Sequence, residues 1–128
     1  MEFTGGCLCG AVRYRVGGPL RDVIACHCTQ CRRQSGHFAA HTSVPLDRFW
    51  LERDTTLSWY RASPSAERGF CRVCGSSLFW KPAAETRISI TAGSLDGPTG
   101  LSIVKHIFCA DQGDYYEIGD DKPQKDQW

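Results

Sequence analysis

The segment Phe70-Cys71-Arg72-Val73-Cys74-Gly75, in a chain of 128 residues, contains half of the ligands expected for a structural zinc site. Two cysteines separated by two residues and followed by glycine are typical of a zinc knuckle, because glycine lets the backbone curl and direct its amides at the sulfurs. A knuckle supplies only two of the four ligands of a structural zinc ion. The other two ligands must come from elsewhere in the chain.

The segment Gly6-Cys7-Leu8-Cys9-Gly10 is a second pair of thiols followed directly by glycine. Two such halves from distant parts of the chain make one closed four-thiolate site. Its ligands would be Cys7, Cys9, Cys71 and Cys74, and they would hold a structural zinc ion. The site would clamp the N-terminal strand to the middle of the domain.

Three further cysteines lie in the segment Cys26-His27-Cys28-Thr29-Gln30-Cys31. A zinc ion bound by three protein ligands keeps an open fourth position, as catalytic sites do. We therefore expect a catalytic zinc ion on Cys26, Cys28 and Cys31, and two zinc ions per chain in all. The alternative is a second structural zinc whose fourth ligand comes from elsewhere. The candidates for that ligand are His27, His37, His41, His106 and Cys109.

The chain contains eight cysteines, which raises the choice between disulfides and metal ions. Its N-terminus shows neither the basic start nor the apolar run of a secretory signal. We therefore expect a cytoplasmic protein, and disulfides are rare in the reducing cytosol. Cys-X-Cys pairs also suit a shared ion better than separate bridges. Metal binding is the favoured interpretation, and a disulfide framework is the alternative for an exported protein.

The remaining sequence is typical of a mainly β domain with antiparallel sheets. Short runs of aromatic and β-branched residues are separated by clusters of Gly, Pro, Ser and Asp. A helical turn closed by glycine is expected at 32–36, and residues 120–127 are expected to form a loose polar tail. The expected strands are 11–16, 37–44, 49–51, 57–61, 78–80, 87–92, 103–108 and 115–118.

Length and charge restrict the classes of function. A chain of this length suits one domain, expected over residues 1–128. The formal net charge of +1 gives no electrostatic reason to expect nucleic acid or an anionic membrane as a partner. No stretch approaches the length of a membrane span. No feature of the sequence specifies an oligomeric state.

With these segments in hand, the chain resembles the glutathione-dependent formaldehyde-activating enzyme family, which also includes centromere-protein-V-like proteins. The resemblance rests on residues 6–14, 26–36 and 70–76, with weaker matches at 106–108 and 116–120. It implies a β-tent fold of antiparallel sheets, with a structural zinc on the first cysteine set and a catalytic zinc on the second.

Two departures from the family lie outside the metal ligands. Cys109 stands where the family usually has a plain hydrophobic residue, and Tyr115-Tyr116 stands where a Trp-Tyr pair is common. The second departure lies where it would alter the rim of a substrate pocket. Neither departure changes the metal sites that the resemblance implies.

The resemblance implies a zinc-dependent carbon–sulfur lyase that forms or cleaves S-hydroxymethylglutathione-like adducts of glutathione and formaldehyde. Glutathione would be the thiol partner, and Arg32 and Arg33 are candidates to bind its carboxylates, because guanidinium groups bind carboxylates in bidentate fashion. The alternative is a non-catalytic zinc-stabilised binding module or a glutathione carrier. The centromere-associated relatives reach chromatin with basic extensions, which this sequence does not contain, and this difference favours the enzyme.

Overall fold

The computed structural model describes residues 1–84 and 86–128, and these residues form mainly β structure. The helical elements are α1 (Thr29–Ser35), η1 (Leu46–Arg48), η2 (Ala92–Ser94) and η3 (Cys109–Asp111). The strands are β1 (Glu2–Gly6), β2 (Arg13–Gly17), β3 (Val23–Cys26), β4 (Ala39–Pro45), β5 (Phe49–Arg53), β6 (Leu57–Ser63), β7 (Ala66–Cys71), β8 (Ser77–Pro82), β9 (Arg87–Thr91) and β10 (Ile103–Ile107).

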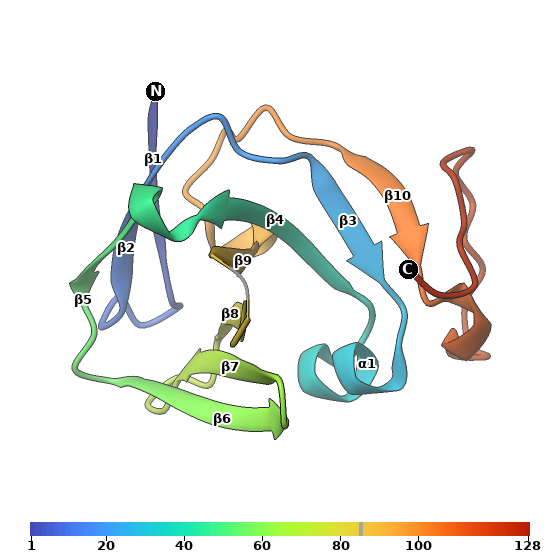
Figure 1. Ribbon diagram of the computed structural model, residues 1–128, viewed down its shortest axis with the longest axis horizontal. Coiled ribbons are helices and arrows are strands. Elements are labelled where there is room, and N and C mark those ends of the chain that lie inside the picture. Colours follow the sequence, from blue (N-terminus) through green and yellow to red (C-terminus); the bar gives the residue numbers. More distant parts are fainter. Residues whose placement is uncertain (85) are drawn as a thin grey trace.

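The strands form two sheets (Figure 1). The small sheet has the order β1-β2-β5, and the large sheet has the order β10-β3-β4-β9-β8-β7-β6. Neighbouring strands pair antiparallel, as expected, except that β10 pairs parallel to β3. No helix among the described residues is both long and apolar enough to cross a membrane.

Alternating side chains give the large sheet two different faces. In β9, Ile88 and Ile90 are buried, whereas Arg87 and Ser89 are only partly buried. Val44 of β4 lies opposite Ile88 and is also buried, so the apolar side chains of the two strands share one face. This face packs against the small sheet, and the opposite face carries the polar side chains.

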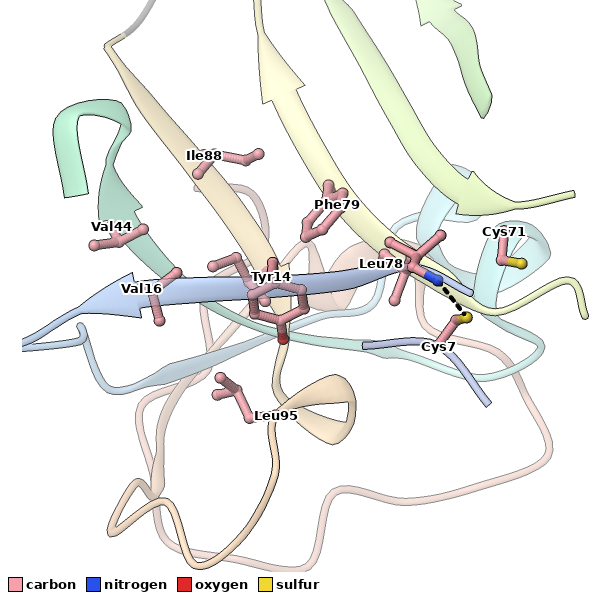
Figure 2. Packing of buried hydrophobic residues seen from close by; sticks show 11 residues of the cluster. Cys7, Tyr14, Val16, Val44, Cys71, Leu78, Phe79, Ile88 and Leu95 are labelled. Atoms are coloured by element: carbon pink, nitrogen blue, oxygen red, sulfur yellow. Dashed lines mark hydrogen bonds between the residues drawn. The ribbon is translucent and has the colours of Figure 1, made fainter. Parts of the chain in front are cut away.

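The hydrophobic core fills the space between the two sheets. Figure 2 shows Tyr14 and Val16 of β2 lying close to Val44, Phe79 and Ile88 of the large sheet. The ring centroids of Tyr14 and Phe79 are 5.3 Å apart, and their planes are nearly perpendicular, which is a favoured aromatic geometry. Each fully buried side chain of this size stabilises the fold by about 1.5–3 kcal/mol.

The short helix α1 lies between distant parts of the large sheet (Figure 1). It follows β3 directly and contacts the far strands through hydrogen bonds. Gln30 Nε2 donates to the carbonyl of Ala62 in β6, and Ser77 Oγ in β8 donates to the carbonyl of Gln34. The predicted helical turn is therefore confirmed, and the helix extends back to Thr29.

Two expectations for the C-terminal part of the chain are wrong. Residues 115–118 form no strand, and the hydroxyls of Tyr115 and Tyr116 bond to the side chains of His37 and His27. The segment 120–127 is not a loose tail. Its backbone bonds to β10, with His106 N donating to the carbonyl of Pro123 at 2.9 Å and Lys125 N donating to that of His106 at 2.9 Å. Because β10 is an edge strand, these bonds satisfy backbone groups that would otherwise be unpaired.

Candidate metal centres and cavity

The cysteines of the predicted structural site lie together where the turn after β1 meets the turn after β7. The Sγ atoms of Cys7, Cys9, Cys71 and Cys74 all lie within 4.8 Å of one another. The Sγ–Sγ distance is 3.6 Å from Cys7 to Cys9 and 3.8 Å from Cys9 to Cys71. A tetrahedral zinc ion with Zn–S bonds of about 2.3 Å requires Sγ–Sγ distances of about 3.8 Å. All eight cysteines are free thiols, so the cluster fits a zinc ion and contains no disulfide.

Each of the two turns is closed by a backbone hydrogen bond from a glycine, and the turns bring their cysteine sulfurs close together. The amide of Gly10 donates to the carbonyl of Cys7 at 3.2 Å, and the amide of Gly75 donates to that of Cys71 at 2.7 Å. The φ angles of Gly10 and Gly75 are 81° and 80°, in the left-handed region that favours glycine. Leu8 N also donates to Ser76 Oγ at 3.0 Å, which joins the two turns directly.

Hydrogen bonds favour the thiolate form of two of these cysteines. The bond from the Thr56 hydroxyl lowers the pKa of Cys71, and the bond from the Ser76 hydroxyl lowers the pKa of Cys74 to about 5. The thiolate is the form of cysteine that binds metal ions. The surroundings therefore favour the thiolate form of Cys71 and of Cys74.

The three central cysteines form a second cluster where β3 passes into α1. The Sγ atoms of Cys26, Cys28 and Cys31 lie within 4.8 Å of one another. Cys28 is the N-cap of α1, and its sulfur accepts a hydrogen bond of 3.2 Å from the amide of Cys31. Hydrogen bonds from Cys26 and Cys31 hold the pKa of Cys28 well below its usual range. The helix start therefore fixes the spacing of the thiols, which also fits a soft metal ion.

Among the described residues, no candidate for a fourth ligand belongs to this cluster. His27 bonds to the hydroxyl of Tyr116 through Nδ1 and to His106 Nδ1 through Nε2, the latter at 2.9 Å. His106 in turn bonds to Asp120 at 2.9 Å. These bonds occupy both ring nitrogens of His27 and of His106. The closed-site alternative, with a fourth ligand from elsewhere, therefore finds no support in the described residues.

A cavity of about 790 Å³ opens on the polar face of the large sheet, and Cys26, Cys28 and Cys31 are among the residues that line it. The charged side chains of its lining are Arg21, Arg68 and Arg87, and no lining side chain is acidic. Trp80, Ile107 and Phe108 provide apolar wall. The cavity therefore combines the thiol cluster with a basic surface.

The arginines of the cavity are held in place by hydrogen bonds. Arg68 is only 6% exposed, and its Nε donates to Gln30 Oε1 at 2.8 Å while its Nη2 donates to Cys31 Sγ at 3.5 Å. Arg87 Nε donates to Ser43 Oγ at 2.9 Å. Arg21 Nη2 donates to the carbonyl of His41 at 3.0 Å. These contacts restrain the three guanidinium groups that line the cavity.

The residues that line the cavity differ from those that the sequence suggested for substrate binding. Arg32 and Arg33 lie on α1 and are not among the residues that line it. Their role in substrate binding stays a prediction. Arg21, Arg68 and Arg87 were not predicted from the sequence as lining residues. The only local signal was the alternation of Arg87 with buried isoleucines in β9, and such a pattern also fits a strand that faces solvent.

The family model of the glutathione-dependent formaldehyde-activating enzymes matches residues 2–111. The chain belongs to this family. Both cysteine clusters of the chain lie inside the residues that the family model matches. The family resemblance seen in the sequence is therefore confirmed.

Individual relatives extend the same comparison. An uncharacterized lyase of Schizosaccharomyces pombe is 25% identical over 119 residues, which cover 91% of this chain and 85% of that protein. A Halomonas elongata protein, provisionally named a glutathione-dependent formaldehyde-activating enzyme, is 33% identical over 87 residues, which cover 62% of this chain and 55% of that protein. The crystal structure of a Rhodobacter sphaeroides protein is similar with a TM-score of 0.64 and 26% identity, covering 76% of this chain and 91% of that one.

Proposed function

We propose that the protein is a zinc-dependent carbon–sulfur lyase that forms or cleaves the adduct of glutathione and formaldehyde. One observation carries this proposal: a cluster of three thiols, without a further ligand among the described residues, lines a cavity of about 790 Å³. A cavity of this size suits a small-molecule substrate. The names of the Schizosaccharomyces pombe and Halomonas elongata relatives support a lyase that acts with glutathione and formaldehyde.

Each cysteine cluster has its own part in the proposal. Cys26, Cys28 and Cys31 would hold the catalytic zinc ion, and the four-cysteine site would hold a structural one. A zinc ion with an open position supplies one function, which is to keep a guest thiol ionised near neutral pH. Arg68 is a positioning residue, because its bonds to Gln30 and to Cys31 Sγ fix the orientation of that sulfur.

The proposed reaction needs no oxidant or reductant. The glutathione sulfur forms a bond to the carbonyl carbon of formaldehyde, and the π electron pair of the C=O bond moves to oxygen. The proton lost by the thiol is balanced by the proton that the new hydroxyl gains. Cleavage of the adduct is the reverse of these steps, so one site serves both directions.

Exchange spectroscopy by NMR tests the proposal. Zinc-loaded protein is added to matched concentrations of glutathione and ¹³C-formaldehyde, and the rate of adduct interconversion is measured. We expect the wild type to accelerate interconversion, Cys28→Ser to lose the acceleration, and Cys109→Ala, a matched change outside both clusters, to keep it. A wild type that binds glutathione without acceleration would instead be a glutathione carrier. A wild type that neither accelerates nor binds would support a zinc-stabilised binding module.

A further inference from the structure

The charged side chains that line the cavity are all positive. Its lining contains the guanidinium groups of Arg21, Arg68 and Arg87 and no acidic side chain. The chain as a whole has a formal net charge of only +1. The positive charge is therefore concentrated where a substrate would enter, and a low-dielectric wall strengthens its effect on a bound anion.

Arg21 and Arg87 lie on either side of one residue, Ser43 of β4. The backbone amide of Arg21 donates to the carbonyl of Ser43 at 3.3 Å, and Arg87 Nε donates to the hydroxyl of Ser43 at 2.9 Å. These two arginines are close enough that the charge of Arg87, after burial, helps to lower the pKa of Arg21. Two like charges held close together cost free energy, and an anion between them would relieve that cost.

Neither arginine has a carboxylate partner among the described residues, whereas Arg13, Arg15 and Arg61 each form such an ion pair. The Nη1 atoms of Arg21 and Arg87 and the Nη2 atom of Arg87 have no hydrogen-bond partner in the described part of the chain. Guanidinium N–H groups without a hydrogen-bond partner can donate to a planar carboxylate, which accepts two hydrogen bonds at once.

We propose that Arg21 and Arg87 form an anion-binding subsite for a substrate carboxylate, in a cavity that accepts acidic groups and excludes cationic ones. The inference rests on the proposed function for the identity of the reactants, but not for the charge of the ligand. Glutathione would place a carboxylate at this subsite and keep its ammonium group outside the cavity. An aldehyde that carries a carboxylate is the other source of the same chemistry.

Binding measurements on the zinc-loaded protein test the subsite. S-methylglutathione has no free thiol, so it cannot bind zinc as a thiolate, and its affinity reports on the rest of the molecule, including its two carboxylates. We expect its affinity to fall about tenfold or more in Arg21→Gln and in Arg87→Gln, because charge-assisted hydrogen bonds are lost. Arg87→Lys should restore part of the affinity. Arg53→Gln makes the same charge change on an exposed residue of the small sheet and should leave the affinity unchanged.

Changes in the ligand separate the two sources and test the exclusion of cations. Glyoxylate is an aldehyde that carries a carboxylate. If the affinity for glyoxylate depends on Arg87 and the affinity for S-methylglutathione does not, the subsite binds the aldehyde. N-acetylglutathione, which lacks the ammonium group, should bind at least as tightly as glutathione. Two results would overturn the inference. One is an affinity for N-acetylglutathione tenfold weaker than that for glutathione. The other is an unchanged affinity for both S-methylglutathione and glyoxylate in both arginine variants.

The two proposals fail independently. Arginine-dependent binding of S-methylglutathione without accelerated adduct exchange would keep the subsite and reject the lyase. Accelerated exchange with arginine-independent binding of both S-methylglutathione and glyoxylate would keep the lyase and reject the subsite. Zinc content and circular dichroism of each variant confirm that it is folded before its affinity is compared, and Arg87→Gln covers the case in which Arg21→Gln does not fold.

Discussion

His41 is a residue whose charge is set by its position on the cavity face of β4. Burial, together with the charges of Arg68 and Arg21, lowers its pKa from 6.5 to about 4. Because this pKa is lower in the folded state, the unfolded chain binds more protons between about pH 6.5 and pH 4. The stability contributed by neutral His41 is therefore present above pH 6.5 and is lost as the pH falls through this window.

We expect His41→Gln to reduce the loss of stability between pH 6.5 and pH 4, since glutamine cannot be protonated. The free energy of unfolding is measured by urea denaturation at several pH values for both proteins. Protonation of the cysteines affects both proteins alike, so the difference between the two curves reports on His41. Parallel curves over this range would contradict the low pKa of the histidine.

Cys109 is the cysteine outside both clusters. It begins η3 and is half-buried. We expect Cys109→Ala to keep both zinc ions and full turnover, and to lose about 1 kcal/mol of stability or less from the missing sulfur contacts. Metal analysis and thermal unfolding check this. Loss of one zinc ion would show that Cys109 completes the three-cysteine site.

At the scale of elements, α1 depends on its C-terminal glycine to hold Cys31 in place. Gly36 has a φ of 82°, and its amide donates to the carbonyl of Arg32 at 2.8 Å. A Cβ atom added at Gly36 would contact no atom within 4 Å, so a substitution there strains only the backbone. The helix has seven residues, and it has few hydrogen bonds to compensate for a lost cap.

We expect Gly36→Ala to destabilise the protein by about 1–2 kcal/mol, the cost of a left-handed conformation with a side chain. Gly93→Ala is the matched control, since Gly93 also has open space but no positive φ, and it should be nearly neutral. Chemical denaturation of both variants measures the difference. Equal stabilities would show that the helix end relaxes without cost.

At the scale of the whole molecule, the four-cysteine site joins the small sheet to the large one. Cys7 and Cys9 follow β1, whereas Cys71 ends β7. A closed structural zinc site contributes directly to folding, whereas an open site exchanges its ion more readily. The two clusters should therefore respond differently to the loss of a ligand.

We expect Cys71→Ser to unfold or aggregate, and Cys28→Ser to stay folded while it loses one zinc ion and its activity. Mild chelation of the wild type should likewise remove one zinc ion and leave a folded protein. Metal analysis and circular dichroism on both variants measure these outcomes. An equal loss of structure in the two variants would reject separate structural and catalytic roles.

The features that depend on local spacing could be predicted from the sequence. The cysteines group as their spacing and glycines indicated, and both clusters are close enough to hold a metal ion. Strands β2, β4, β5, β6, β8, β9 and β10 overlap the strands expected from the sequence, whereas β1, β3 and β7 were not predicted. β1 was not predicted because it ends in Gly5 and Gly6, and glycine is not typical of strands. Gly5 is required by the tertiary structure, since a Cβ atom there would lie 2.3 Å from the Tyr14 hydroxyl.

Tertiary structure alone decided which polar side chains face the cavity. Arg21, Arg68 and Arg87 come from separate segments, and only the curvature and strand order of the large sheet bring them onto the same wall as the cysteines. Tertiary structure also decided that the C-terminal segment pairs with β10. Alternation along a strand separates its two faces, but the register of distant strands determines whether a polar face meets solvent or a cavity.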